Sequence, residues 1–546
     1  MSVALAGAPQ AARSPRPERG GGAPLLAAYA LASFLAFPHP VAGRVLDLGW
    51  LLAWLAPALL VAGLRGLAPR RAARHGFLAG LVAHAAILHW IYVVTVVYGR
   101  APVAVGVLAP VGLAAYMALF TAAFGAVLAL LARRGLDSPP AVAALWAALD
   151  HGRHWILSGF PWGVIGYAQH ENAWLLGLAP WTGVIGLSWV TALGGAALAD
   201  LLRALRGGGG RPRTALGWLG AVALAHGLGG LSLLLAPDLP AGTGATVRIA
   251  VLQGDIDQGV KWSPAFADRT LEVYEDLTRR AVQEGARLVV WPETAVPGAI
   301  ELDLALRERI AALARESRAT LVVGGVGIEG RDRDFRFFDS AFVFDPEGRL
   351  LDRYDKTHLV PFGEYVPLRG VLGLFVSAVA RGIAPDDVTA GPPPRAIRIP
   401  VPGGPVGGVT AGVPICYELL FPDLMRRFVR DGAGVLLAIT NDAWYGRTGA
   451  PYQFLAITAL RSAELRVWTA RAANTGVSAF IDERGRVVEH TPIFQPGLLV
   501  RDVPLRPPPL GGSFYARHGD VFAWACWAQA AAWIVVARRR AAGGEA

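Results

Sequence analysis

The chain has 546 residues, a mean hydropathy of +0.42 and a formal net charge of +10 at neutral pH. It is too long for one domain and too apolar for an ordinary soluble protein. Most of the arginines flank apolar runs instead of forming one basic face, which argues against a nucleic-acid-binding protein.

The N-terminal part, residues 24–236, contains repeated apolar stretches of the length that spans a membrane. A helix needs about 20 apolar residues to cross a hydrocarbon core of ~30 Å. The stretches predict seven spans, and a last apolar stretch near the C-terminus predicts an eighth. The predicted spans are 24–40, 47–66, 76–98, 103–132, 139–157, 174–202, 214–236 and 519–537. The first is short, and the fifth contains Asp150, His151 and Arg153.

The arginines predict how these spans are oriented. If the N-terminus is cytoplasmic and every span crosses, the cytoplasmic segments receive sixteen arginines and the short loops on the other side receive three. Cytoplasmic loops carry such an excess in membrane proteins. Both termini are therefore expected in the cytoplasm, with residues 237–518 outside it. The three arginines on the side away from the cytoplasm are Arg44, Arg100 and Arg153.

Between the last two spans the composition changes to that of a soluble α/β domain. Short β-rich runs such as "TVRIAVLQGD", "RLVVWPET" and "GVLLAITND" end in turn residues. Helical patterns cover 265–284 and 451–471, and "GVSAFIDERGRVVEH" predicts a hairpin that turns at "ERG". The predicted organisation has five parts. They are a cytoplasmic tail (1–23), a helical bundle (24–236), an extracytoplasmic α/β domain (237–518), a final span (519–537) and a second tail (538–546).

Three residues that could perform covalent catalysis lie at predicted strand ends. Glu293 ends "LVVWPE", Lys356 follows "RLLDRYD", and Cys416 ends "VTAGVPIC". Polar residues at the carboxyl ends of strands converge on a common crevice in such sheets. There a carboxylate can take the thiol proton, the sulfur can attack a carbonyl, and an ammonium can hold the oxyanion. Lys356 is one of only two lysines in an arginine-rich chain; the other is Lys261.

Structural interpretations of the same residues stay open at this point. A lone cysteine after a strand is often a small buried residue. Outside the cytoplasm a disulfide would be usual, but the other cysteine, Cys526, falls inside the eighth predicted span. Glu293 and Lys356 could form a structural ion pair.

Four motifs, in order and spacing, resemble those of the nitrilase superfamily: "VVWPETAVP", "YDKTHLVPFGEYVP", "GVPICYE" and "TNDAWYG". The chain is most similar to the apolipoprotein N-acyltransferases of bacterial envelopes, which place a nitrilase-like domain between a bundle of spans and one last span. The resemblance extends to "SGFPWGVIGY" at 158–167. It implies an α-β-β-α sandwich for the α/β domain.

The resemblance also implies roles for individual residues. Glu293 resembles the general base, Lys356 the oxyanion-stabilising cation and Cys416 the nucleophile. Glu364 and Glu418 resemble supporting carboxylates. Three aromatic residues are candidates for substrate binding: Trp262, Tyr417 and Trp444. For Trp262 simple loop packing is an alternative, and for Tyr417 and Trp444 a position in the wall of the site is favoured. Tyr445 stands where the family pattern has Phe.

The reaction that the resemblance implies is acyl transfer through a thioester. A phospholipid would donate the acyl chain, and the α-amino group of the N-terminal S-diacylglyceryl cysteine of an apolipoprotein would accept it. We expect a multi-pass protein of the bacterial inner membrane with its catalytic domain on the periplasmic face. We expect a monomer that needs no cofactor and no metal. The apolar segment 366–385 is either a membrane-dipping arm that gates acyl-chain entry or a buried helix.

Two other kinds of function remain as alternatives. One is a membrane-anchored amidase of the same superfamily that acts on a small soluble substrate. The other is a transporter or lipid-binding scaffold, which the few charges within the spans disfavour.

Overall fold

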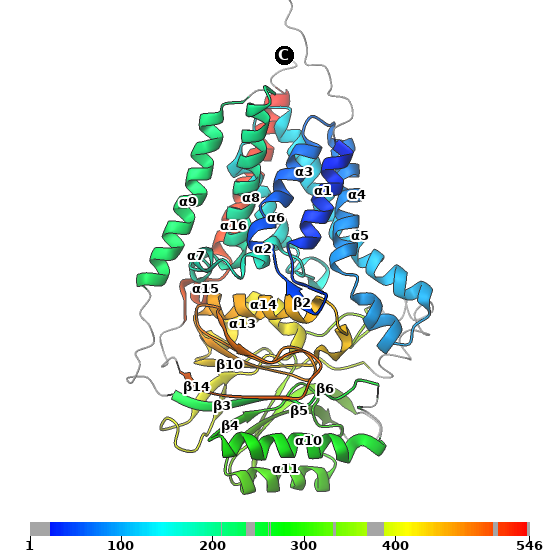
Figure 1. The fold of residues 1–546 in the computed structure, drawn as a ribbon, viewed down its shortest axis with the longest axis vertical. Coiled ribbons are helices and arrows are strands. Elements are labelled where there is room, and N and C mark those ends of the chain that lie inside the picture. Colours follow the sequence, from blue (N-terminus) through cyan, green and yellow to red (C-terminus); the bar gives the residue numbers. More distant parts are fainter. Residues whose placement is uncertain are drawn as a thin grey trace, which may run out of the picture.

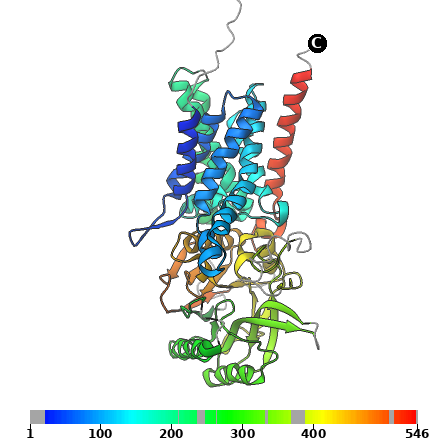
Figure 2. The same ribbon diagram turned by 90° about the vertical axis from the view of Figure 1, so that its right-hand side faces the viewer.

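A helical bundle stands on a layered α/β part in the computed structural model of the chain (Figure 1). The structure describes residues 22–208, 210–235, 246–259, 261, 264–330, 335–367, 387–505 and 512–542. A small hairpin, β1 (His39–Val41) and β2 (Arg44–Leu46), extends from the bundle (Figure 2).

The bundle is built from helices on both sides of the α/β part in the sequence. Its longer helices are α1 (Gly22–Leu35), α3 (Leu55–Leu64), α4 (Pro69–Ile87), α5 (Val103–Ala132), α6 (Pro139–Gly152), α8 (Ala179–Leu205), α9 (Pro212–Leu235) and α16 (Val521–Ala542). Short helices α2 (Gly49–Leu52) and α7 (Ala173–Leu176) and a π-helical stretch, η1 (Val93–Tyr98), connect them.

Within the described residues, four helices are long and apolar enough to cross a membrane: α5, α8, α9 and α16. The prediction of several apolar helices is therefore confirmed, while the number of eight spans is not. The other four predicted spans are shorter helices or carry charge. Helix α3 has 10 residues, and α1 and α6 have 14 each. Helix α4 begins with Pro69, Arg70 and Arg71.

The end of the bundle far from the sheets is held by arginines. Arg65, which follows α3, donates to Asp137 at 2.8 Å and to Asp200 of α8 at 2.6 Å. Arg134 and Arg540 donate to each other's carbonyl oxygens. The ends of α3, α5, α8 and α16 therefore meet at one arginine-rich end.

The exposed tryptophans of the described residues lie at the opposite end, near the junction with the sheets. They are Trp50, Trp155, Trp174, Trp181 and Trp524. Tryptophan is enriched where a membrane meets water. The bundle therefore has an aromatic level near the α/β part and a basic end away from it.

The α/β part has two six-stranded sheets among its described residues. The first contains β3 (Thr246–Gln253), β4 (Leu288–Val290), β5 (Thr320–Glu329), β6 (Arg336–Phe344), β7 (Leu350–Asp355) and β14 (Gly497–Pro504), in the order β14-β3-β4-β5-β6-β7. The second contains β8 (Ile397–Ile399), β9 (Val409–Gly412), β10 (Val435–Thr440), β11 (Trp468–Ala473), β12 (Ala479–Ile481) and β13 (Val487–His490), in the order β13-β12-β11-β10-β9-β8.

The sheets pack face to face between two helical layers. Helices α10 (Pro264–Gln283) and α11 (Leu304–Ser317) cover the first sheet, while α13 (Pro422–Arg430) and α14 (Ala450–Leu465) lie between the second sheet and the bundle (Figure 1). Side chains alternate along a strand. On β3, Ile249 and Val251 therefore enter the core between the sheets, and Ala250 and Leu252 enter the core under α10.

The helix predicted over 451–471 is too long. Helix α14 ends at Leu465, because Arg466 adopts a left-handed conformation (φ 56°) and the chain then enters β11 at Trp468. Strand β11 pairs in parallel with β10, so sheet pairing outweighs the helical pattern here. The predicted hairpin is confirmed as β12 and β13.

Hydrogen bonds join the bundle to the α/β part. Trp162 donates to Gln453 of α14 at 2.7 Å, and the backbone N–H of Val184 donates to Glu464 of the same helix at 2.7 Å. Gln453 also donates to the carbonyl of Pro38. Helix α14 therefore bonds to three separate segments of the bundle.

Candidate active site

The three predicted catalytic residues come from strand ends of both sheets. Glu293 follows β4, near the middle of the first sheet, and Lys356 follows the edge strand β7. Cys416 follows β9 of the second sheet and begins a short 3-10 turn, η4 (Cys416–Leu420). The site therefore needs both sheets, where the sequence suggested strand ends of one sheet.

The Lys356 ammonium lies among three carboxyl groups. Its Nζ is 3.1 Å from Oε1 of Glu293, 3.1 Å from Oδ2 of Asp339 and 2.5 Å from Oε1 of Glu364. The Lys356 side chain is fully buried, and Glu293 and Asp339 are almost so. An ammonium has three donors, and these bonds use all of them. The three carboxyl groups could hold a metal ion by spacing alone, but the ammonium lies where that ion would bind.

Asp339 is a site residue that the sequence reasoning missed. It lies on β6, where its carbonyl accepts the backbone N–H of Lys356 at 2.8 Å. A signal was present, because Asp339 is a charged residue inside the largely apolar run "FFDSAFVF". A buried charge in such a strand needs a partner.

The carboxyl groups differ in proton affinity. Burial alone would raise the pKa of Glu293, but Lys356, a hydrogen bond from Asp339 and Lys261 outweigh burial, and the pKa is lowered. Burial raises the pKa of Asp339 well above its usual value. Lys356 acts to lower this pKa, but the negative charge of Glu293 acts to raise it. Burial also raises the pKa of Glu364. Glu293 is thus ionised and available as a base.

Cys416 is held in an unusual backbone conformation. Its φ is +48°, a left-handed value that is rare for a residue other than glycine and clusters at functional sites. Burial and the negative charge of Glu293 raise the pKa of the Cys416 thiol, while Lys356 and a hydrogen bond with Thr440 act in the opposite direction. The thiol is therefore protonated at rest. Cys416 and Cys526 are both free.

Glu418 connects the cysteine turn to the lysine loop. One oxygen accepts the backbone N–H of Ile415 at 2.8 Å, and the other accepts the N–H of Thr357 at 2.7 Å and the hydroxyl of Tyr354 at 2.8 Å. Burial raises the pKa of Glu418 to about 7. Because the bonds reach both sides of the site, Glu418 fixes Cys416 relative to Lys356. Among the described residues, Glu418 forms no hydrogen bond with the three carboxyl groups around Lys356.

The second lysine also lies at the site. Lys261 is buried, and its Nζ is 2.6 Å from Oγ1 of Thr294 and 3.3 Å from the carbonyl oxygen of Glu293. Burial lowers the pKa of Lys261 to about 8, although Glu293, Asp339 and Cys416 act against this. The scarcity of lysine in the sequence was the signal that could have predicted Lys261 as a site residue.

The predicted aromatic residues have different positions. Tyr417 is buried, and its hydroxyl donates to the carbonyl of Gly159 at 3.2 Å. Trp444 packs edge-on against Tyr98 of η1, with ring centres 6.1 Å apart. Both thus touch the bundle. Trp262 and most of the segment 366–385 lie outside the described residues.

Tyr445 lies in an aromatic cluster at the junction. Its ring is 4.9 Å from that of Trp90 and 5.9 Å from that of Trp162, measured between centres. Tyr445, which stands where the family pattern has Phe, thus packs among aromatic rings of the bundle.

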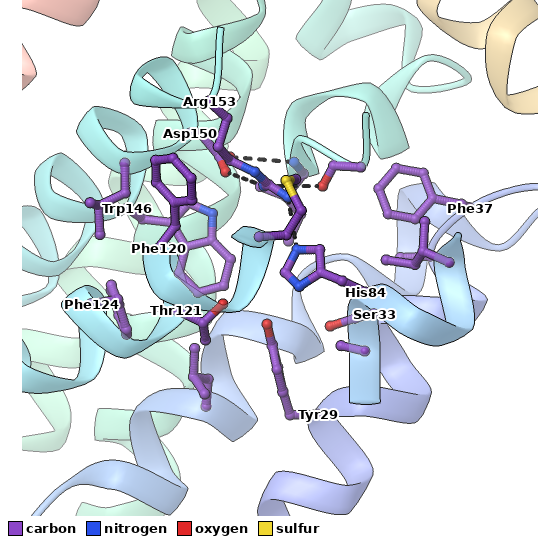
Figure 3. Close-up of a pocket in the computed structure, with 18 residues that line it drawn as sticks. Tyr29, Ser33, Phe37, His84, Phe120, Thr121, Phe124, Trp146, Asp150 and Arg153 are labelled. Carbon is purple, nitrogen blue, oxygen red and sulfur yellow. Dashed lines mark hydrogen bonds and ion pairs between the residues drawn. The ribbon is translucent and has the colours of Figure 1, made fainter. Parts of the chain in front are cut away.

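A separate polar cluster lies inside the bundle (Figure 3). Arg153 is bonded to Asp150 at 2.8 Å and donates to Nε2 of His84 at 2.8 Å. Nδ1 of His84 is 2.7 Å from the carbonyl of Gly80, which fits a neutral ring that donates there and accepts from the arginine. The adjoining cavity of about 50 Å³ has no triad residue in its lining.

Two family models match the chain. The carbon-nitrogen hydrolase model matches residues 248–506, and the model of the apolipoprotein N-acyltransferase N-terminal domain matches residues 29–197. A protein of Geobacter metallireducens named apolipoprotein N-acyltransferase is 39% identical over 511 residues, which cover 93% of each chain. One of Azotobacter vinelandii with the same name is 35% identical and covers 93% of this chain and 95% of its own. A solved amidase of the nitrilase superfamily, from Nesterenkonia, is 22% identical, covers 50% of this chain and 93% of its own, and has a TM-score of 0.36.

Proposed function

This chain belongs to the apolipoprotein N-acyltransferase family, and from that premise we propose that it acylates the N-terminal S-diacylglyceryl cysteine of apolipoproteins with an acyl chain from a membrane phospholipid. The observation that carries the mechanism is the Lys356 ammonium bonded to Glu293, with Cys416 in electrostatic reach of both. The apolar helices fit an inner-membrane enzyme whose two substrates are lipid-anchored.

In the first half-reaction Glu293 removes the thiol proton as Cys416 attacks the ester carbonyl. Base assistance is required because the thiol is protonated at rest. Once Glu293 is neutral it binds the Lys356 ammonium less strongly, which releases one N–H of Lys356 toward the oxyanion. Glu293 returns its proton to the departing alkoxide. The products are a thioester and a lysophospholipid.

In the second half-reaction the free α-amino group of the apolipoprotein attacks the thioester. Glu293 accepts a proton from the amine, Lys356 again holds the oxyanion, and the Cys416 sulfur leaves and recovers a proton from Glu293. The C–S bond breaks as the amide C–N bond forms. Water has to be kept from the thioester during this step.

Further parts of the proposal concern supporting residues and the membrane. Glu364 orients Lys356 and Glu418 orients Cys416, while Tyr417 and Trp444 line the substrate path. The arginine-rich end of the bundle lies in the cytoplasm with both termini, and the catalytic domain, 237–518, lies on the periplasmic face between the bundle and the final span. Arg65 at one end and the exposed tryptophans at the other support this orientation. The protein works as a monomer.

Intact mass spectrometry after incubation with phosphatidylethanolamine tests the mechanism. We expect a mass gain of one acyl chain that hydroxylamine removes and that is absent from Cys416→Ala. Addition of a diacylglyceryl peptide with a free amino terminus should then discharge the adduct as an amide. Turnover of small soluble amides without an adduct would instead indicate a membrane-anchored amidase. A folded protein with neither property would indicate a scaffold.

A further inference from the structure

The carboxyl cluster around Lys356 has more acidic groups than the buried cations can neutralise. Glu293, Asp339 and Glu364 each place an oxygen within 4.8 Å of the other two. The buried ammonium groups at the site are Lys356 and Lys261. Three ionised carboxylates against two ammonium groups would leave a net negative charge in a buried site, which is costly unless one carboxyl group keeps its proton.

Asp339 is the carboxyl group with an unpartnered oxygen. Its Oδ2 accepts a hydrogen bond from Lys356, but its buried Oδ1 has no donor among the described residues. Both oxygens of Glu364 are bonded, one to Lys356 and the other to the backbone N–H of Val360 at 2.9 Å. A buried carboxylate oxygen without a donor is costly. The same oxygen as an O–H becomes a donor, and Glu293 is the acceptor within reach.

We propose that Asp339 is a positioning residue that retains one proton and donates it as a hydrogen bond to Glu293. The proposal rests on the general-base role of Glu293 given above. The hydrogen bond stabilises the carboxylate form of Glu293, so the base remains ionised although it is buried. The raised pKa of Asp339 and the lowered pKa of Glu293 have the directions that this arrangement requires.

Asp339 is well placed to hold both the base and the cation. Its carbonyl accepts the backbone N–H of Lys356, its Oδ2 accepts a hydrogen bond from the Lys356 ammonium, and its buried Oδ1 is left for a further bond. The neighbour Ser340 points away, to Asp355, at 2.5 Å. One residue of β6 therefore fixes Lys356 and Glu293 relative to each other without touching the acyl group.

The charged and titratable groups that surround Asp339 and Glu293 come from several elements. They are Lys356 after β7, Glu364 in the following turn, Lys261 before α10, Cys416 in η4, and Asp442 and Tyr445 in η5 (Asp442–Tyr445). A change at Asp339 can be separated from these groups because replacement by asparagine preserves shape and a donor while it removes the titratable proton.

The decisive measurement is the pH dependence of thioester formation, followed as acylation of Cys416 by phosphatidylethanolamine. Its acid limb reports protonation of Glu293. In Asp339→Ala the hydrogen bond to Glu293 is lost, the pKa of Glu293 rises, and the limb should move up by about one pH unit. In Asp339→Asn the amide still donates, so the limb should stay near its wild-type position.

An ionised Asp339 would produce the opposite pattern. Removal of its negative charge would lower the pKa of Glu293, and the acid limb would move to lower pH in both variants. That result would overturn the proposal. Because wild-type acylation is measured in the same series, failure of the wild type to form a thioester would count against the proposed mechanism, and not specifically against Asp339.

A spectroscopic measurement applies even where a variant acylates too slowly. At a pH above the pKa of Glu418, which is about 7, the wild-type infrared spectrum should contain the carbonyl band of a buried protonated carboxylic acid. This band should be absent from Asp339→Asn and present in the matched control Glu364→Gln. A band that disappears in Glu364→Gln and persists in Asp339→Asn would assign the proton to Glu364 and refute the proposal.

Discussion

At the scale of single residues, the site is organised by a compact cation. Lys356 makes three bonds to carboxyl oxygens over distances of 2.5–3.1 Å, all from one nitrogen. The planar guanidinium of an arginine could not converge on three carboxyl groups in that way. The other lysine, Lys261, is buried at the same site. In the part of the chain that the structure describes, both lysines thus serve one cluster.

The electrostatics of Cys416 predict that loss of the base makes the thiol more reactive toward alkylation. Glu293 raises the pKa of the thiol, so Glu293→Gln should lower it and speed alkylation of Cys416 by iodoacetamide at pH 8. Acyl transfer should nevertheless fall by about 100-fold or more, because the base is missing.

Lys356→Met is the matched comparison for that prediction. Lys356 lowers the pKa of the thiol, so its loss should slow alkylation at the same pH. Peptide mapping distinguishes Cys416 from Cys526. Slower alkylation in Glu293→Gln would contradict the assignment of charge at the site.

At the scale of elements, the position of Glu293 depends on close contact between two strand ends. A Cβ on Gly324 of β5 would lie 2.1 Å from the carbonyl oxygen of Pro292 and 2.8 Å from Cα of Glu293. Only glycine allows this approach. Strand β5 thus supports the peptide that carries Glu293, the proposed base, and its neighbour β6 supplies Asp339.

Gly324→Ala should displace Glu293 while the domain remains folded. A shift of about 1 Å in a catalytic group can cost about 100-fold in rate, so thioester formation should fall by about that factor. The matched control is Gly325→Ala on the same strand, where the nearest atom to the new Cβ is the end of the Ile300 side chain at 3.1 Å. Equal losses of activity in the two variants, with equal losses of thermal stability, would indicate a general effect on the sheet.

At the scale of the whole molecule, the bundle forms part of the site's surroundings. In the segment 158–167, the carbonyl of Gly159 accepts a hydrogen bond from the Tyr417 hydroxyl. Trp162 of the same segment donates a hydrogen bond to Gln453 of α14. Tyr417, which follows the proposed nucleophile Cys416, is therefore bonded directly to the bundle. A single anchoring helix could not supply these contacts, which agrees with an enzyme whose substrates reach the site from the bilayer.

The arrangement of charge and tryptophan predicts the orientation in the membrane. Arg206 lies in the loop after α8 at the basic end, and Glu347 is exposed on the α/β part. In spheroplasts, a membrane-impermeant maleimide should label Glu347→Cys directly and Arg206→Cys only after permeabilisation. The native cysteines are buried and give little background. Labelling of Arg206→Cys alone in intact spheroplasts would reverse the orientation.

The sequence by itself determined the class of the molecule and the identity of the principal chemical groups. Apolar runs such as 103–132 and 519–537 identify α5 and α16, because length and hydropathy are local properties. The motifs that contain Glu293, Lys356 and Cys416 place each at a strand end, since turn residues interrupt β-rich runs there.

Only the tertiary structure decided which groups share the site. Asp339 and Lys261 are far in sequence from Cys416. The pairing of β6 with β7 brings Asp339 to Lys356, and Lys261 reaches Glu293 only in the folded chain. The end of α14 at Leu465 was likewise decided by the pairing of β11 with β10. Proton affinities depend on burial and on neighbours from several strands. No local pattern contains that information, because it arises from contacts that exist only once the chain has folded.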